Sequence, residues 1–425
     1  MPSPYRSLFA TPGARAFSLA GLVGRMPLSM TGIGVVTMIS QVTGRYGLAG
    51  ALSATLALSS ALCGPRVSRL VDRYGQRRVL RPVAVVTVLA VSGLLLCVRE
   101  GAPDWTYFGC VLLAGLTPSL GAMVRARWSE IHRGSPELLH TAYSLESVVD
   151  EVVFIVGPVL SVGLCTMAFA EAGPLLAMVF LAVGVALLTA QRATEPAAHP
   201  QAVMGGGSAM RSAGLRILCV VFAGVGMMFG AVDVITVAFA DERGHKGLAS
   251  LVLACYALGS CLSGVVFGML PPRRSVADRF RWGVAGMAVS MIPPLLVGSM
   301  PLLALALFVA GTTIAPTMVA AMGLVERLVP RGRLTEGITW TSTGMAVGVA
   351  AGAALAGRVI DAHGASAAFA VPAMAAVAAA AAAFLGYGRL RPTPRQEERF
   401  GDERDERGGD AAGGAAEPGA GGSLA

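Results

Sequence analysis

"PVAVVTVLAVSGLLLCV", residues 82–98, contains no charged side chain and is almost entirely apolar. Runs of this length and composition indicate helices that cross the hydrocarbon core of a lipid bilayer. Similar runs occur at 174–190, "PLLAMVFLAVGVALLTA", and at 250–270, "SLVLACYALGSCLSGVVFGML". The 425-residue chain is 54% hydrophobic and 14% charged, with a mean hydropathy of +0.66, whereas soluble domains contain roughly a quarter charged residues. The sequence therefore predicts an all-α protein that crosses a membrane several times.

Hydropathy and helix-breaking residues divide the chain into twelve predicted membrane spans. The longest interruption, residues 191–214, is rich in Pro, Gly, Ala and Ser, as is typical of a linker. It separates an N-terminal six-helix half, residues 1–190, from a C-terminal six-helix half, residues 215–388. Residues 389–425 have few apolar side chains to bury and are predicted to form a disordered cytoplasmic tail. The predicted spans are 16–39, 47–65, 82–98, 105–125, 141–167, 172–190, 215–240, 248–270, 283–300, 302–325, 338–358 and 366–386.

The basic residues predict the orientation of these spans. Cytoplasmic loops carry an excess of Lys and Arg, and most of the 33 basic residues fall on the side that holds both termini. Both termini are therefore expected in the cytoplasm, with the protein in the cell membrane. The formal charge of +8 is scattered between apolar runs, so it does not predict a nucleic-acid partner. The loops on the other side contain Arg45, Arg99, Arg243, Lys246 and Arg358.

Small residues recur every four positions in two of the predicted spans. Such stripes allow two helix backbones to approach closely in lipid. Gly and Ala are abundant in this chain, so composition alone is the alternative explanation. The two stripes are Gly344, Gly348, Gly352 and Ala356 in span eleven, and Ser260, Gly264 and Gly268 in span eight.

The predicted loop between the second and third spans contains "SRLVDRYGQRRVL", residues 68–80. This stretch resembles the loop signature of the major facilitator superfamily, Gly-x-x-x-Asp-Arg-x-Gly-Arg-Arg-x. Ser68 stands in place of the first Gly, and the counterpart in the second half, residues 267–283, is degraded and lacks the Asp. The resemblance implies two six-helix bundles and secondary transport of a small-molecule substrate by a monomer without a cofactor. The matching positions are Asp72, Arg73, Gly75, Arg77 and Arg78.

The resemblance also implies a role for Asp72. In family members this Asp lies near the N-terminal end of span eleven, which here begins around 336–341. A helix N-terminus carries partial positive charge, so the carboxylate is expected to hold the cytoplasmic side shut. Arg73, Arg77 and Arg78 are assigned to the same gate, the alternative being that they only set the topology.

A second, partial resemblance lies in span five. "VGP", residues 156–158, resembles the Gly-Pro of the antiporter signature in drug-efflux branches of the superfamily, although Val153 replaces the upstream Gly. Gly157 and Pro158 are therefore expected to bend the helix. Other stretches resemble uncharacterised actinobacterial drug-efflux-like members.

Three carboxylates occur close together in "SLESVVDEVVFIVGP", residues 144–158. Glu146 and Asp150 share a helix face, and Glu151 is turned away by about 100°. Asp150 and Glu151 are expected about 14–15 Å along span five, near the bilayer centre. An ionised side chain there costs at least about 2.5–3.5 kcal/mol unless it faces protein or water, and desolvation favours the neutral form. Such a carboxyl group is suited to loading and releasing a proton.

Two arginines are the expected partners of these acids. Arg25, in span one, is predicted to pair with Asp150 or Glu151. Arg125, near the inner end of span four, is predicted to pair with Glu146 at the cytoplasmic gate. The alternative is that these pairs only hold helices together.

A further acid, Asp233, lies in the outer half of span seven. The proton-coupling or cavity residues are thus predicted to be Asp150, Glu151, Arg25 and Asp233. Phe229 and Trp340 are candidate apolar lining residues, with packing as the alternative.

The leading functional hypothesis is proton antiport that exports small, partly apolar compounds, with protons and the lipid bilayer as further partners. The alternative within transport is proton-coupled import of a sugar or another polar metabolite. A polar site would favour Asn and Gln, but the chain contains no Asn. A non-transporting membrane sensor and an integral membrane enzyme are the alternatives from other classes. The chain has no Walker loop, and its five histidines lack metal-ligand spacing, so no metal or cofactor is predicted.

Overall fold

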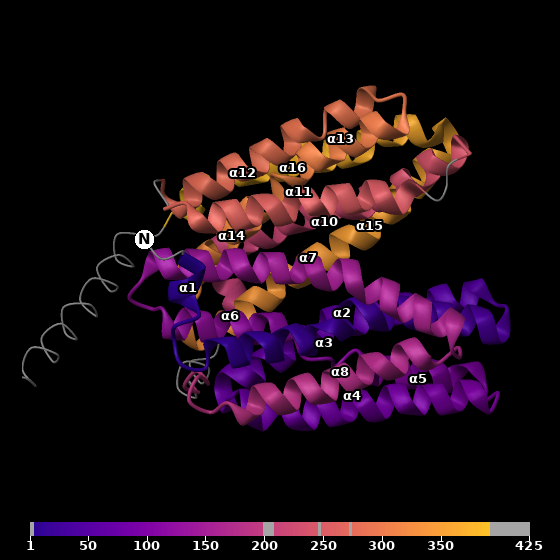
Figure 1. The fold of residues 1–425 in the computed structure, drawn as a ribbon, viewed down its shortest axis with the longest axis horizontal. Coiled ribbons are helices and arrows are strands. Elements are labelled where there is room, and N and C mark those ends of the chain that lie inside the picture. The colour runs from indigo at the N-terminus through magenta and orange to yellow at the C-terminus, as the bar shows by residue number, and fades with distance from the viewer. Residues whose placement is uncertain (1–3, 199–207, 245–247, 272–273, 392–425) are drawn as a thin grey trace, which may run out of the picture.

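A computed structural model of the chain describes residues 4–198, 208–244, 248–271 and 274–391. Throughout these ranges the secondary structure is helical and contains no strand (Figure 1). The first helices are α1 Pro4–Leu8, α2 Ala14–Thr43, α3 Tyr46–Tyr74, α4 Gln76–Arg99, α5 Asp104–Ala114, α6 Leu120–Ile131, α7 Pro136–Met167 and α8 Ala172–Ala190. The remaining helices are η1 Ala209–Arg211, α10 Ala213–Glu242, α11 Ala249–Met269, α12 Val276–Ser290, η3 Pro293–Leu296, α13 Met300–Gly311, α14 Ile314–Leu328, η4 Arg331–Arg333, α15 Leu334–Ala368, α16 Ala370–Leu385 and α17 Tyr387–Leu390.

Within the described ranges, nine helical segments are long and apolar enough to cross a membrane. The predicted class, an all-α multi-pass membrane protein, is confirmed. Span twelve corresponds to the shorter apolar helix α16, and span nine to α12, which has 15 residues. The count of twelve therefore stays a prediction.

The fourth predicted span is not one helix. α5 ends at Ala114 and α6 begins at Leu120. Pro118 has no backbone N–H to continue the helical hydrogen bonds. A side chain at Gly115 would collide with Ser59 of α3, whose hydroxyl donates to the Leu112 carbonyl at 2.7 Å. Close packing of α3 at this point accompanies the break.

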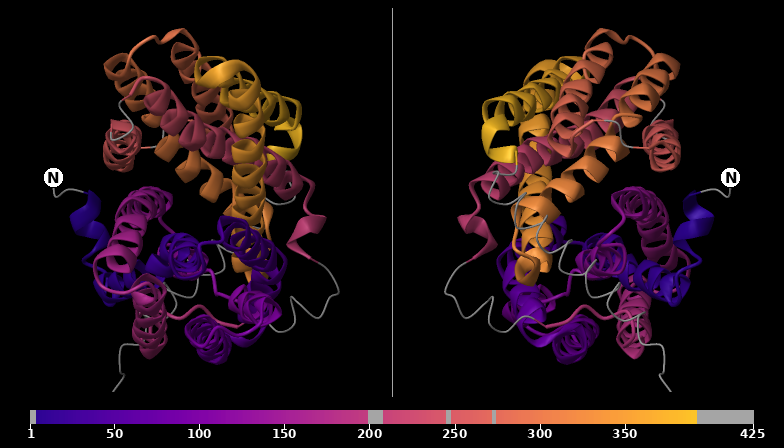
Figure 2. Two further views of the ribbon diagram at one scale, coloured as in Figure 1. Left: turned by 90° about the vertical axis from the view of Figure 1, so that its right-hand side faces the viewer. Right: turned by 90° about the vertical axis from the view of Figure 1, so that its left-hand side faces the viewer.

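The helices gather into two groups in space (Figures 1 and 2). We call α1–α8 the first half and α10–α17 the second half. The halves meet where α3 packs against α15 and where α7 packs against α11 and α14. The middle of the predicted linker, 199–207, and most of the predicted tail, 392–425, lie outside the described residues. The proposed domain boundaries stay predictions.

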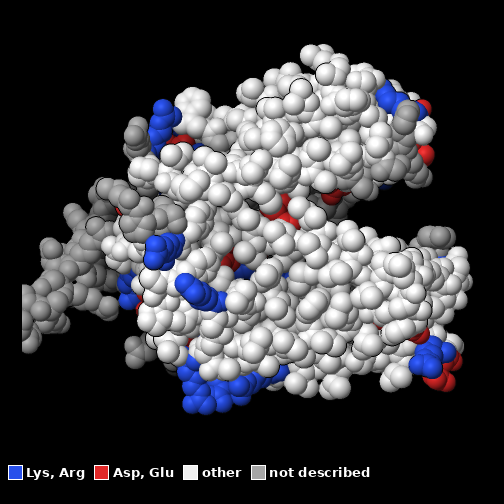
Figure 3. Space-filling view, in the orientation of Figure 1, with Lys and Arg blue, Asp and Glu red and all other residues white. Residues whose placement is uncertain are grey.

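The two halves touch at one end of the molecule and separate at the other, leaving a hollow between them (Figure 3). The touching end contains residues 66–81, 127–140, 274–281 and 326–339, which include many of the arginines. We call it the basic end and the opposite one the open end.

The second half is built around direct backbone contact between α10 and α15. A Cβ atom at Gly344, Gly348 or Gly352 of α15 would collide with backbone carbonyl groups of α10. Ala356, which completes the stripe, is fully buried. The prediction that this stripe serves helix packing is confirmed, and the contact needs the absence of side chains.

We expect Gly348→Ala to destabilise the protein, because its methyl group would overlap the Ala223 carbonyl and push α15 away from α10. Overpacking of this kind costs about 1–3 kcal/mol. The matched control is Gly357→Ala in the same helix, where no atom lies within 4 Å of the added Cβ. Thermal unfolding of the detergent-purified variants measures the difference. Equal melting temperatures for Gly348→Ala and wild type would contradict this packing.

Candidate functional site

Four charged side chains form a compact cluster in the first half. Arg25 of α2 donates to Asp150 Oδ1 of α7 at 2.9 Å and forms an ion pair with Glu146, one turn earlier on α7. Arg125 of α6 donates to Asp150 Oδ2 at 2.5 Å. Trp128 Nε1 donates to Glu146 at 2.8 Å. Two guanidinium groups thus face two carboxylates, and the cluster is neutral overall. We call these four charged residues the ion cluster.

The structure corrects the predicted pairing of Arg125 with Glu146. Arg125 pairs with Asp150, and Glu146 pairs with Arg25. The four-residue spacing places both acids on one face of α7, so the two terminal nitrogens of the Arg25 guanidinium can each contact one of them. Glu146 is fully buried among helices of the first half, so it belongs to this cluster and not to a gate between the halves. The expected contact of Arg25 with Asp150 is present.

Glu151 points to a different neighbour. It accepts a hydrogen bond of 2.7 Å from the Ser260 hydroxyl of α11, which is fully buried, so the bond joins the two halves. Among the described residues, Glu151 has no Lys or Arg partner. Of the two adjacent acids whose orientation the sequence left open, Asp150 therefore faces the ion cluster and Glu151 faces the other half.

A second acid without a basic partner in the described chain lies on α10. Asp233 is solvent-exposed, and acidic atoms line the hollow between the halves (Figure 3). Tyr256 of α11 interacts electrostatically with both Asp233 and Glu151. Its side chain is 7% exposed, and its hydroxyl lacks a hydrogen-bond partner in the described part of the chain. Phe229 packs edge-on against the Tyr256 ring at 6.3 Å between centroids.

The basic end is held by polar contacts between α3 and the first turns of α15. The Glu336 backbone N–H donates to Asp72 at 3.0 Å, and Arg69 donates to the Glu336 carboxylate at 2.7 Å. Ser68 and Thr339 share a hydrogen bond of 2.7 Å. The contact expected between Asp72 and the start of span eleven is present. Ser68 makes one of these bonds at the position where the family signature has Gly.

Arg73 and Arg77 of the loop signature contact residues outside α15, and the assignment of the loop arginines to the gate stays a prediction. Arg73 lies over the ring of its neighbour Tyr74, 4.9 Å from the centroid. The Arg77 backbone N–H donates to Glu195 at 2.8 Å, and Arg78 is exposed. Gly75 has φ +90°, a conformation that side chains disfavour, so it permits the tight α3–α4 turn.

Gly157 and Pro158 lie within the continuous helix α7. A Cβ at Gly157 would collide with the Ser29 hydroxyl of α2, which donates to the Val153 carbonyl at 2.8 Å. Gly157 thus permits close approach of α2 and α7. The helix-bend assignment of these two residues stays a prediction.

Sequence reasoning missed four contributors to these contacts: Arg69, Trp128, Tyr256 and Ser260. Ser260 belongs to the small-residue stripe of span eight, which predicts packing and not a hydrogen bond, and Arg69 is one of many arginines in its loop. No group of three His, Cys, Asp or Glu side chains placed to hold a metal ion occurs among the described residues.

The model of the Major Facilitator Superfamily matches residues 17–281 and 218–409. Comparison with curated protein sequences gave no match.

Three solved structures illustrate the likeness in fold. A bacterial homologue of the iron transporter ferroportin in an outward-facing state has 16% identity and a TM-score of 0.72, covering 88% of this chain and 98% of that one. The human organic anion transporter MFSD10 (TETRAN) has 14% identity and a TM-score of 0.66, covering 89% and 100%. A single-residue variant of the E. coli fucose:proton symporter FucP also has 14% identity and a TM-score of 0.66, and the match covers 87% of this chain and 98% of that one. At these identities the likeness concerns the fold alone.

We expect Arg25→Met to destabilise the protein, because Glu146 and Asp150 would lose their shared cation inside the first half. Leaving such a charge uncompensated costs about 3–5 kcal/mol. Adding Glu146→Gln should restore part of the loss, and Arg66→Met, at an exposed arginine, is the matched control. Thermal unfolding in detergent measures all three. An unchanged melting temperature for Arg25→Met would show that the cluster is not structural.

At the basic end, Asp72→Ala should loosen the first turn of α15, because the Glu336 N–H loses its charged acceptor. A hydrogen bond to a charged group contributes about 1.5–3 kcal/mol, so amide exchange in residues 334–338 should accelerate about tenfold or more. Asp72→Asn, which keeps an acceptor, should be intermediate. Hydrogen-exchange mass spectrometry gives the rates. The control is Asp104→Asn, whose partner Arg45 lies at the open end; equal rates in Asp72→Ala and this control would refute the assignment.

Proposed function

This chain belongs to the major facilitator superfamily and is a transporter rather than an enzyme, and on that premise we propose that it is a proton-coupled exporter of small, partly apolar compounds. It would work by alternating access, with the two halves rocking about a central site. The proton and the substrate would move in opposite directions.

The observation that carries the proposal is the hydrogen bond between Glu151 and Ser260. It joins the halves at 2.7 Å, and the carboxyl group lacks a cationic partner in the described residues. An unpaired carboxylate in a low-dielectric site favours its neutral form. Gain and loss of one proton therefore changes both the charge between the halves and the hydrogen bond that links them.

The ion cluster supports this division of roles. Asp150 receives hydrogen bonds from two arginines, and Glu146 from one arginine and Trp128. Both acids are thus engaged by cations within the first half, whereas Glu151 is not. We assign Arg25, Arg125, Glu146 and Asp150 to positioning α7, and Glu151 to proton coupling. Asp233, exposed on α10, is the second candidate proton carrier.

The predicted orientation indicates the side of the membrane to which the hollow opens. If the basic end faces the cytoplasm, as the distribution of Arg predicts, the hollow opens to the outside, and both termini are cytoplasmic. Asp72, Arg69 and Ser68 then close the cytoplasmic side through α15. In this state Glu151 and Asp233 would take up protons from outside.

The side chains near these acids favour a partly apolar substrate. Tyr256 of α11 interacts electrostatically with Asp233 of α10 and Glu151 of α7, and Phe229 of α10 packs against the Tyr256 ring. Aromatic faces contribute large apolar area and can bind cations. Import by proton symport would use the same acids, and the direction of coupled flux separates the two.

We expect Glu151→Gln to abolish proton-coupled transport, because Gln cannot carry the proton although it can still bond Ser260. Wild type in proteoliposomes with an imposed pH gradient would be challenged with lipophilic cations, antibiotics and sugars. A substrate should dissipate the gradient in wild type, whereas Glu151→Gln should fall to the rate of protein-free vesicles. Glu137→Gln, an exposed acid on the same helix, should match wild type.

The outcomes discriminate between the functions. Proton entry driven by outward movement of a lipophilic compound supports export, and cotransport of a sugar supports the symport alternative. Full transport by Glu151→Gln and by the Glu151→Gln/Asp233→Asn double variant would rule out both acids as proton carriers.

A further inference from the structure

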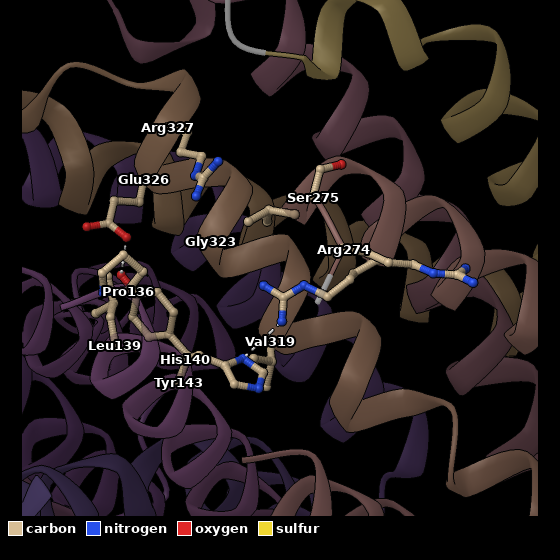
Figure 4. A pocket seen from close by; sticks show the side chains of 12 residues that line it. Pro136, Leu139, His140, Tyr143, Arg274, Ser275, Val319, Gly323, Glu326 and Arg327 are labelled. Carbon is tan, nitrogen blue, oxygen red and sulfur yellow. Dashed lines mark hydrogen bonds between the residues drawn. The ribbon is translucent and has the colours of Figure 1, made fainter. Parts of the chain in front are cut away.

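A pocket at the basic end lies between the two halves (Figure 4). Its first wall is the start of α7, with Leu139, His140 and Tyr143, and its second wall comes from the start of α12 and the end of α14. It contains about 690 Å³ of space, counting the part open to solvent. This site is separate from the ion cluster and from Glu151.

The pocket carries an excess of positive charge. Arg274, Arg279 and Arg327 line it, and within the described residues none of the three has a carboxylate partner. The Arg279 Nε atom is buried without an acceptor in the same part of the chain. Glu326 is the lining carboxylate, and it is engaged by Ser129 at 2.6 Å and by Tyr143 at 3.4 Å. The pocket therefore has two arginines, Arg279 and Arg327, whose charge a single anion could neutralise, and Arg274 points away from them (Figure 4).

The position of Arg279 depends on contact between the halves. Its Nη1 atom donates to His140 Nδ1 at 3.2 Å, and His140 Nε2 contacts the Phe267 carbonyl at 2.8 Å. This arrangement requires a neutral imidazole that donates from Nε2 and accepts at Nδ1. In Figure 4 the dashed line from His140 marks the bond to Arg279, and Arg274 extends away toward the rim.

We propose that this pocket binds a phosphate group, held mainly by Arg279 and Arg327. The planar guanidinium fork matches phosphate oxygens bidentately, and a dianion suits more than one such cation. At the basic end, the phosphate could belong to an anionic lipid headgroup, which polybasic surfaces attract, or to a soluble phosphate ester. The inference does not depend on the proposed function.

A bound phosphate would favour the closed basic end. The pocket exists only while α7 of the first half lies against α12 and α14 of the second. A ligand that binds one conformation alone stabilises it by mass action. The phosphate would therefore hold the halves together at the basic end and raise the melting temperature of this conformation.

The test is direct binding to the full-length, detergent-purified protein. Dioleoyl phosphatidate and dioleoyl phosphatidylcholine would be compared by native mass spectrometry, and glycerol 3-phosphate by calorimetry in phosphate-free buffer. We expect Arg327→Gln to weaken phosphate binding at least about tenfold, as for a lost charge-assisted hydrogen bond. Arg327 is exposed and should be replaced without misfolding. Arg211→Gln, an exposed arginine outside the pocket, is the matched control and should bind like wild type.

Each outcome decides the proposal. Binding of phosphatidate but not of glycerol 3-phosphate identifies a lipid headgroup, and binding of both identifies a soluble ester as well. Absence of binding to wild type overturns the proposal, as does equal weakening in Arg327→Gln and Arg211→Gln, which would indicate nonspecific surface charge. If phosphatidate or glycerol 3-phosphate raised the melting temperature of Arg327→Gln as much as that of wild type, the proposed site would be overturned too.

Discussion

The need to neutralise buried charge inside the protein organises the first half. A lipid bilayer offers no water to ionised side chains, so a charge buried between helices is stabilised by a counter-charge on a neighbouring helix. Arg25 meets this need by bridging Glu146 and Asp150, and Arg125 completes the balance. This ties α2, α6 and α7 together at one level. It also leaves Glu151, one residue away, as the acid whose charge the cluster does not cancel.

The contacts within each half differ from those at their interface. Ion pairs and close backbone contact, as between Gly24 of α2 and Gly184 of α8, both join helices in the first half, and backbone contact along the glycines of α15 joins helices in the second. The interface at the basic end consists of hydrogen bonds, including those of Ser68 and Ser129, together with the Arg69–Glu336 ion pair. A bond of this kind contributes about 0.5–3 kcal/mol net, so the basic end is held by several separate contacts of modest strength.

Much of this arrangement follows from sequence patterns, and the rest depends on packing. Apolar runs predict the helices because backbone groups in lipid must be satisfied within each segment, and the loop signature predicts where Asp72 lies. The spacing of Glu146 and Asp150 predicts a shared face but not which arginine each acid meets, and the predicted Arg125–Glu146 pair is wrong. The bond between Ser260 and Glu151 could not be predicted, because nothing local marks a polar side chain whose partner is more than a hundred residues away.

The glycine contact between α10 and α15 has a mechanical consequence. Where two backbones touch, there is no intervening layer of side chains whose rotamers could absorb a shift. Gly230 of α10 lies against Val349 of α15, thirteen residues, or about 20 Å of helix, from Glu336. We therefore expect α10 and α15 to move together as one rigid unit. Asp233 lies near the Gly230–Val349 contact, and the Asp72 contact lies at Glu336. A displacement of α10 by a ligand in the hollow is thus expected to move the start of α15 as well.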